Sequence, residues 1–462
     1  MTKQEGNITI KLESIKEIPM STVKIDFNNI VGAIKNMHAV NNGPIVAGSD
    51  QTRGNHLYYK AAGIPYARNH DAGFDSRYGG EHTVDVHAIF PNFDADVNDP
   101  ASYDFPCTDL YTKQIFDVGT RVFYRLGSKI EHGIKKYGTV MPKDFQKWAE
   151  ICEHIIRHYT EGWADGFYYD IEYWEIWNEP DLDPDDSTNK RCWSGTEKDF
   201  ARLYVTAANH LKSCFPNLKI GGPALAWNED WLERFFDNVR EFNGGKNPPL
   251  DFLSWHWYGT EPQKMSDKGT RIYDIAIKAG YKDFEAILNE WNYVRGWGPE
   301  FIYSIKTIIG MKGAAFTSAC MSAAQHNPKI DMLMYYDARP TGMNGLFDIY
   351  TLEPLKGYYP FLIYSKLKAL SNEAKTNSDD ECIYCVAAAK GDKAGIMLTY
   401  YAENDDMLNK NVTIEAEGLD LDGARVYITD ESNTMSLYPV RTFENNKLTL
   451  YLKRNSIVYI EK

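Results

Sequence analysis

Strand-like and helix-like segments alternate between residues 29 and 372, and this alternation constrains the fold more than any other feature of the sequence. The helix predicted over 142–159 is typical: its apolar side chains recur every three or four residues and form one stripe. Eight strand-then-helix units follow one another in this way. Eight parallel units in one segment are the signature of a closed (β/α)8 barrel. The expected strands cover 35–44, 64–71, 120–127, 173–180, 218–226, 251–259, 284–292 and 330–340, and the expected helices 56–63, 111–119, 142–159, 196–215, 229–242, 271–280, 301–325 and 358–371.

After Asn372 the sequence changes character. Short segments that alternate apolar and polar residues are separated by turn residues, which predicts an antiparallel β-sandwich. Two early segments, 8–14 and 22–27, show the same alternation and are expected to join it. The sequence therefore predicts N-terminal strands over 1–28, a barrel over 29–372 and a C-terminal β-sandwich over 373–462.

Charge and hydropathy exclude several partners. The net charge is −14 and no basic stripe is present, so a surface that follows nucleic-acid phosphates is not expected. No apolar run approaches the length of a membrane span. The start, MTKQEGNITIKLES, lacks the layout of a signal peptide. We expect a cytoplasmic protein, or a periplasmic or secreted one if a signal peptide preceded this start; the oligomeric state stays open.

Metal and cofactor motifs are incomplete. Seven scattered cysteines argue against a disulfide framework, and no second pair completes the C-x-x-C spacing of 382–385. His154 and His158 have the spacing of metal ligands without the accompanying glutamate. Asp181, Asp183 and Asp185 imitate a calcium loop that lacks its glycine and final glutamate, and we expect a solvated loop there. The sequence predicts neither a metal nor a cofactor.

Polar side chains end most of the expected barrel strands. Active sites of such barrels lie at the C-terminal ends of the strands, so these residues are the functional candidates. On strand 284–292 we expect Ala286, Leu288 and Glu290 to face the interior, and Ile287 and Trp291 to face the helices. The polar strand ends are Asn41 and Asn42, Arg68 to Asp71, Asn178 and Glu179, His256 and Tyr258, Glu290, and Asp337.

Two of these strand ends carry glutamates that are expected to face one cavity. Two carboxyl groups across an aromatic-lined cleft are what cleavage of a glycosidic bond requires. Glu179 has apolar neighbours, which raise the pKa of a carboxyl group, so it is expected to be the acid. Glu290 is expected to stay ionised beside the hydrogen-bonding side chains of Tyr258 and His256, and to act as the nucleophile.

Several of these residues, and others near them, also suit purely structural roles. Glu179 could cap a helical turn that begins at Pro180, or belong to an ion pair. Glu175 is expected to be an internal hydrogen-bonding residue rather than a catalyst. Trp255 and Trp257 are expected to pack against helices, and it stays open whether Trp291 and Trp297, just past the seventh strand, line sugar subsites or pack.

Three motifs carry a family resemblance: EIWNEPD (175–181), WHWYG (255–259) and ILNEWN (287–292). Together they resemble the retaining (α/β)8 glycoside hydrolases of clan A, and family 39, the β-xylosidase and α-L-iduronidase family, above all. The resemblance implies a barrel with a β-sandwich, Glu179 as acid/base and Glu290 as nucleophile. It further implies that Asn178 contacts the sugar 2-hydroxyl, that His70 binds the sugar and that Tyr258 touches the nucleophile.

The sequence departs from this family at the second and eighth strands. Arg68 and His70 are separated by an asparagine, and the eighth strand, YYDARP, contains no tryptophan, so the sugar is not identified. We expect a retaining, β-xylosidase-like exo-glycosidase that acts on oligosaccharides, and its further substrate-binding residues are expected to be His256, Trp291, Asn41 and Asp337. The alternatives are a non-catalytic carbohydrate-binding barrel, or an enzyme for an arabinoside, a galactoside or a uronide. A uronide requires a cation, and Arg68, Arg125 and Arg339 are the candidates.

Overall fold

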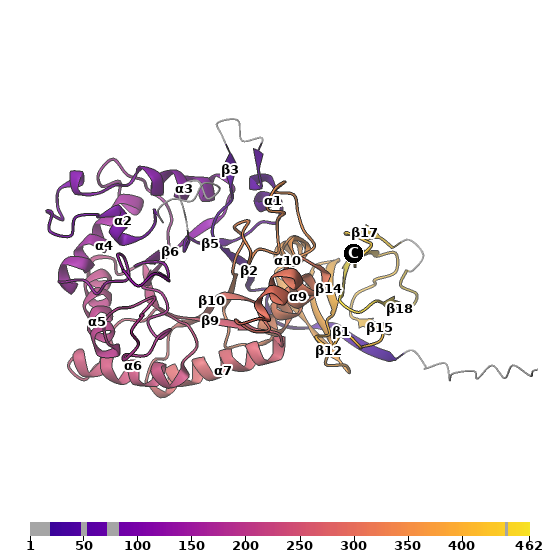
Figure 1. Cartoon of the computed structure of the whole chain (residues 1–462). Coiled ribbons are helices and arrows are strands. Elements are labelled where there is room, and N and C mark those ends of the chain that lie inside the picture. The colour runs from indigo at the N-terminus through magenta and orange to yellow at the C-terminus, as the bar shows by residue number, and fades with distance from the viewer. Residues whose placement is uncertain (1–18, 48–52, 72–82, 439–441) are drawn as a thin grey trace, which may run out of the picture.

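The computed structural model describes residues 19–47, 53–71, 83–438 and 442–462, so the strand expected at 8–14 lies outside the described residues. Figure 1 shows a barrel surrounded by helices and, beside it, a sheet built from the end of the chain. Within the described residues, no helix combines the length and the apolar character that crossing a membrane requires.

Eight parallel strands close into a barrel, which confirms the predicted fold class. The hydrogen-bonded order follows the chain and closes where the last strand pairs with the first. The strands are β2 (Asn36–Asn41), β5 (Tyr66–Arg68), β6 (Arg121–Leu126), β7 (Tyr173–Ile176), β8 (Lys219–Leu225), β9 (Phe252–Gly259), β10 (Glu285–Tyr293) and β11 (Met332–Tyr335).

Helices surround the barrel near the predicted positions, but α2 (Val86–Ile89) was not predicted, α3 begins at Pro106 instead of residue 111, and two further helices differ. The helix expected over 301–325 is two helices, because the chain at Gly310 is extended and glycine stabilises a helix poorly. The helix expected over 271–280 begins earlier, at Pro262, a residue suited to the first helical turn. The helices are α1 (His56–Ala61), α2 (Val86–Ile89), α3 (Pro106–Asp117), α4 (Phe145–Thr160), α5 (Glu197–Cys214), α6 (Glu229–Phe242), α7 (Pro262–Lys278), α8 (Phe301–Ile308), α9 (Met311–His326) and α10 (Tyr358–Leu370).

The interior of the barrel corrects the parity predicted for β10. Ile287 lies in the cluster of side chains that fills the barrel, whereas Leu288 packs in the core between barrel and helices. The pairing of β10 with β9 shifts between Leu288 and Glu290, which is the signature of a bulge. Because of this extra residue, both Asn289 and Glu290 reach polar partners at the centre of the barrel.

The second unit is a nine-stranded sheet that folds over on itself. The buried side chains of its two ends belong to one core, which confirms the predicted sandwich. The pairing of β1 with β15 is parallel and the other pairings are antiparallel. In order, the strands are β17 (Ser436–Leu437), β16 (Arg425–Thr429), β19 (Ser456–Glu461), β14 (Lys393–Tyr400), β13 (Ile383–Lys390), β12 (Asn372–Ser378), β1 (Met20–Ala33), β15 (Lys410–Glu417) and β18 (Lys447–Leu452).

The domain boundaries predicted from the sequence fall inside strands of this sheet. The boundary expected after residue 28 falls within β1, and the one expected after residue 372 falls within β12, which was not among the predicted strands. The division of the chain into three parts therefore remains a proposal.

Helices α9 and α10 lie between the barrel and the sheet (Figure 1). Helix α9 consists almost entirely of small or apolar residues that are buried on all sides, as expected for a helix covered from two directions. Met397 and Tyr459 of the sheet belong to the same apolar core as the barrel helices. The Ser318 hydroxyl and the Thr399 hydroxyl are 2.6 Å apart across this contact.

Candidate active site

A cavity of about 650 Å³ opens at the C-terminal ends of the barrel strands. Several residues that the sequence singled out line it: His70, Asn178, Glu179, Tyr258, Glu290 and Trp297. His256 lies directly behind the two glutamates, and its ring contacts both of them. One oxygen of Glu179, one oxygen of Glu290 and a ring nitrogen of His256 all lie within 4.8 Å of one another.

Glu179 follows β7 in an irregular turn. Its backbone φ is +49° and that of Trp177 is +74°, which are uncommon values for residues other than glycine. The turn is held by the Trp177 N–H, which donates to the Leu126 carbonyl at 2.7 Å, and by the Glu179 N–H, which donates to the Ala224 carbonyl at 3.0 Å. Strained backbone of this kind costs free energy and is concentrated at functional sites.

The surroundings of Glu179 favour its protonated form. Burial raises its pKa to about 8, and the negative charge of Asp181 adds to this. The Nδ1 atom of His256 lies 2.8 Å from Glu179 Oε1, and the Cys192 thiol donates to Oε2 at 3.7 Å. Burial lowers the pKa of His256 to about 4, so this ring is neutral, and its Nδ1 shares a hydrogen bond with the Glu179 carboxyl group.

Glu290 has more partners that stabilise its charge. The Tyr258 hydroxyl donates to Oε1 at 2.5 Å, and Arg68 Nη1 lies 3.3 Å from Oε2. Burial raises the pKa of Glu290 to about 7, while His256 and Arg68 act in the opposite direction. The pKa of Glu179 is thus the higher of the two, in the order that the sequence predicts.

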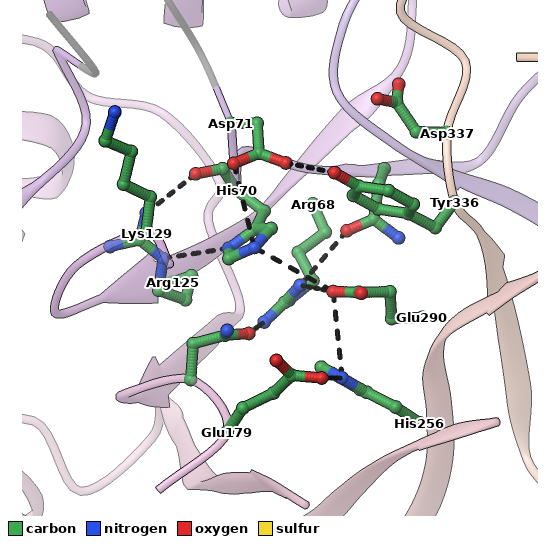
Figure 2. Close-up of polar contacts among 12 residues, drawn as sticks. Arg68, His70, Asp71, Arg125, Lys129, Glu179, His256, Glu290, Tyr336 and Asp337 are labelled. Carbon is green, nitrogen blue, oxygen red and sulfur yellow. Dashed lines mark hydrogen bonds and ion pairs between the residues drawn. The ribbon is translucent and has the colours of Figure 1, made fainter. Parts of the chain in front are cut away.

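A buried network beneath the cavity fixes the site. Arg68 Nε donates to Glu175 at 2.8 Å, its Nη2 donates to Asn178 Oδ1 at 2.7 Å and its Nη1 donates to Asn41 Oδ1 at 3.1 Å. Figure 2 shows the same guanidinium beside Glu290. Glu175 therefore has the internal role predicted for it, and Arg68 has no hydrogen-bonding capacity left over for a uronide.

A second network holds His70. Arg125 Nε donates to His70 Nδ1 at 3.3 Å, while its Nη2 forms a buried ion pair with Asp85 (Figure 2 shows the arginine beside the ring). Since Nδ1 accepts, the ring proton is on Nε2, which lies 3.8 Å from Glu290. Burial lowers the pKa of His70 well below its usual range. His70 therefore presents a neutral N–H donor toward the cavity.

Besides His256, three residues predicted to bind substrate do not line the cavity. Asn41 is buried below it, where its amide donates to the Asn289 carbonyl at 2.8 Å. Asp337 is buried, forms an ion pair with Arg339 at 3.2 Å and points away from Glu290 (Figure 2). Trp291 packs on the helix side of β10 against Phe316, because the bulge turns only Asn289 and Glu290 inward.

Other cavity residues were not predicted from the strand ends. Arg191 and Trp227 come from loops and Lys268 from α7, so the strand-end rule could not find them. Trp257, expected to pack against helices, stacks on Phe316 and also lines the cavity. Arg339, considered as a cation for a uronide, is paired with Asp71 and Asp337.

The loop after Glu179 is not solvated throughout, contrary to the expectation. The Asp181 carboxylate is buried and accepts hydrogen bonds from the backbone N–H groups of Ala226, Trp227 and Asn228. Asp183 accepts hydrogen bonds from the backbone N–H, Nε and Nη2 of Arg191. These aspartates therefore tie the loop to its neighbours.

Two triads of side chains among the described residues bring three donor atoms within 4.8 Å: Glu179, His256 and Glu290, and Glu153, His210 and Cys214. The first triad already has hydrogen-bond partners inside the cavity. In the second, Arg157 neutralises Glu153 at 2.8 Å and His210 Nε2 lies 2.6 Å from the same carboxylate. The predicted absence of a metal stays a prediction.

Comparison with known proteins agrees with this geometry. The profile of the glycosyl hydrolases family 39 matches residues 66–287, which include Glu179 and His256 and end just before Glu290. A β-xylosidase of Caldicellulosiruptor saccharolyticus is 26% identical over 202 residues, which are 41% of this chain and 38% of that protein. A β-xylosidase of Geobacillus stearothermophilus is 31% identical over 130 residues, 27% of this chain and 23% of that protein. The matched residues thus span well under half of either relative.

Solved structures share the whole architecture. A glucosidase from Croceicoccus marinus superimposes with a TM-score of 0.75 at 21% identity and covers 96% of this chain and 98% of its own. A monomeric β-xylosidase from Caulobacter crescentus gives a TM-score of 0.68 at 15% identity, with 95% and 99% covered. At these identities the likeness concerns the fold. Together with the family profile and the curated relatives, it supports a relationship to the glycosyl hydrolases family 39.

Proposed function

We propose that this protein is a retaining β-glycosidase of the β-xylosidase type that acts on oligosaccharides. The observation that carries the proposal is the pair Glu179 and Glu290, which face one cavity with an oxygen of each within 4.8 Å of the other. Carboxyl groups roughly 5 Å apart suit a double displacement, whereas an inverting enzyme needs roughly 6.5–9.5 Å to admit a water molecule. That both curated relatives named above are β-xylosidases supports the choice of sugar.

In the first step, Glu290 attacks the anomeric carbon and the bond from this carbon to the leaving oxygen breaks. Glu179 gives its proton to that oxygen, so the leaving group departs as a neutral alcohol. Tyr258 and Arg68 each hold one oxygen of Glu290, which orients the carboxylate for attack.

In the second step, Glu179 is a carboxylate and takes a proton from water while the water oxygen attacks the anomeric carbon. The ester bond to Glu290 breaks, and both carboxyl groups return to their starting states. The Oδ1 atom of Asn178 accepts from Arg68, so its amide N–H groups are left to donate to the sugar 2-hydroxyl.

A panel of aryl glycosides tests the proposal. We expect the β-xyloside to be cleaved faster than the β-glucoside, β-galactoside and α-arabinoside, and ¹H NMR of the first product to show the β-anomer. An α-anomer as first product would rule out the retaining mechanism. Oligosaccharide binding without turnover of any glycoside would instead identify a carbohydrate-binding barrel.

A further inference from the structure

Lys268 is a buried lysine in the wall of the catalytic cavity. It belongs to α7, lines the cavity and is 8% exposed. Its ammonium donates to the carbonyl oxygen of His256 at 3.1 Å and lies 5.9 Å from the centre of the Trp255 ring. Within the described residues, no carboxylate forms an ion pair with it.

This arrangement leaves the ammonium incompletely satisfied. An ammonium carries three N–H donors, and lysine is rarely buried without a partner because desolvating its charge is costly. Elsewhere in the described chain this cost is offset. Buried Lys410 pairs with Asp380, and Lys35 donates to three backbone carbonyls within 2.8 Å. Lys268 has one such acceptor, and it faces a cavity.

The position of Lys268 relative to the two glutamates indicates which part of a substrate it meets. Its acceptor is the carbonyl of His256, whose ring binds Glu179. The negative charges of Asp181 and Glu229 act on it, and so does that of Glu179 whenever Glu179 is ionised. The proposed role of Glu179 is to protonate the leaving oxygen. Lys268 therefore stands on the side of the leaving group.

Arg191, which also lines this cavity, is already paired with a carboxylate. Arg191 forms a two-pronged ion pair with Asp183, so its charge is compensated before any substrate binds. Glu179 is protonated when substrate enters, which leaves Glu290 as the only ionised catalytic carboxylate. An anionic group on the leaving side consequently meets a free ammonium rather than a second negative charge.

We propose that Lys268 binds an anionic substituent, a carboxylate or a sulfate ester, on the sugar that leaves, so that acidic oligosaccharides are the preferred substrates. This inference rests on the proposed glycosidase function. It concerns the leaving sugar, whereas the residues around Glu290 contact the sugar that becomes attached to the enzyme.

Three β-xylosyl disaccharides that differ only at C6 of the leaving sugar test the inference: those of glucuronic acid, glucose 6-sulfate and glucose. The assays are run near pH 7, where Lys268 is still mostly protonated because burial lowers its pKa only to about 8, and where Glu290, with a pKa of about 7, is partly ionised. We expect kcat/KM to be higher for an anionic disaccharide than for the glucose one. The anionic disaccharide with the higher kcat/KM shows whether the substrate group that Lys268 binds is a carboxylate or a sulfate ester.

Lys268→Met should lower the ratio of anionic to neutral kcat/KM by about 10- to 100-fold, the range of a hydrogen bond to a charged group. Lys268→Arg should retain part of the ratio. The matched control is Lys264→Met, one turn earlier on α7, where the lysine is exposed. Circular dichroism verifies folding, and Lys268→Gln replaces the Met variant if that variant does not fold.

Equal kcat/KM for the three wild-type substrates would overturn the inference, and so would an equal loss on all three in Lys268→Met. Failure of the glycosidase function is recognised separately, because the neutral aryl β-xyloside would then not be cleaved. In that case calorimetry with the Glu290→Gln protein decides. A Kd ratio between acidic and neutral disaccharides that Lys268→Met abolishes supports the inference, and equal Kd values reject it.

Discussion

At the scale of single residues, two glutamates acquire different chemistry from different neighbours. Glu179 has a neutral histidine and a thiol beside it, whereas Glu290 has a tyrosine hydroxyl and an arginine. The first set stabilises a negative charge less than the second. This difference in surroundings supports the proposed division into an acid, Glu179, and a nucleophile, Glu290, although the residue type is the same.

Removing each glutamate should have a different consequence. Glu290→Ala should lower kcat on every glycoside by about 10³-fold or more, because no other group forms the covalent intermediate. Glu179→Ala should lower kcat/KM by about 10²- to 10⁴-fold on a poor leaving group and far less on a dinitrophenyl glycoside, which needs no proton.

Azide identifies the two roles, since it is a nucleophile that needs no base. With Glu179→Ala it should restore turnover and give a β-glycosyl azide from a β-glycoside. With Glu290→Ala it should replace the enzyme nucleophile and give the inverted azide. The opposite pattern in the NMR spectra of the products would mean that the two assignments must be exchanged.

The pH profile of kcat/KM should be a bell with its maximum between about 7 and about 8. Activity rises as Glu290 loses its proton with a pKa of about 7, and falls as Glu179 loses its proton with a pKa of about 8. These values belong to the coupled pair. With a dinitrophenyl glycoside, Glu179→Gln should lose the alkaline limb; a retained limb would assign it to another group.

At the scale of elements, one arginine ties four barrel strands together. Arg68 of β5 contacts Glu175 of β7, Asn41 of β2 and Glu290 of β10. All of these groups are buried, so each depends on the others for the hydrogen bonds that replace water.

Arg68→Met should lower the free energy of unfolding by about 3–5 kcal/mol, because it leaves Glu175 charged and without its ion-pair partner in the barrel. Urea denaturation measures this change. The control is Arg121→Met on the neighbouring strand, where a 47% exposed side chain pairs with Asp170 at the surface, and the cost should be about 0–1 kcal/mol. Similar losses in both variants would contradict a buried structural pair.

At the scale of the whole molecule, barrel and sheet share packing and should unfold together. Met397 and Leu398 are neighbours on β14, yet Met397 packs into the core of the barrel helices and Leu398 into the core of the sheet. Tyr401, just past this strand, stacks edge-on against Phe316 of α9. One strand therefore contributes to both cores.

Leu398→Ala should lower the free energy of unfolding by about 2–5 kcal/mol through the cavity it leaves. All 11 tryptophans lie between residues 148 and 297, so their fluorescence reports on the barrel alone. We expect the fluorescence midpoint in urea to shift with this distant substitution, and to stay in place for Leu437→Ala, whose side chain is 54% exposed. An unchanged midpoint for Leu398→Ala would show that the sheet unfolds independently.

The sequence by itself determined the barrel, the sandwich and the convergence of Glu179, Glu290, His256 and Tyr258. These features follow from local periodicity: strands and helices have fixed repeats, and parallel strands bring their C-terminal ends to one face. The order of the two glutamate pKa values agrees with the sequence prediction, although the tertiary structure brings Tyr258 and Arg68 to Glu290.

Only the tertiary structure decided which strand-end residues reach the cavity. A bulge in β10 turns Asn289 and Glu290 inward and leaves Trp291 against a helix. Lys268 enters the cavity wall from helix α7 and not from the end of a strand. The register of a strand and the reach of a helix side chain are set by contacts between segments distant in the sequence, and no local pattern encodes them.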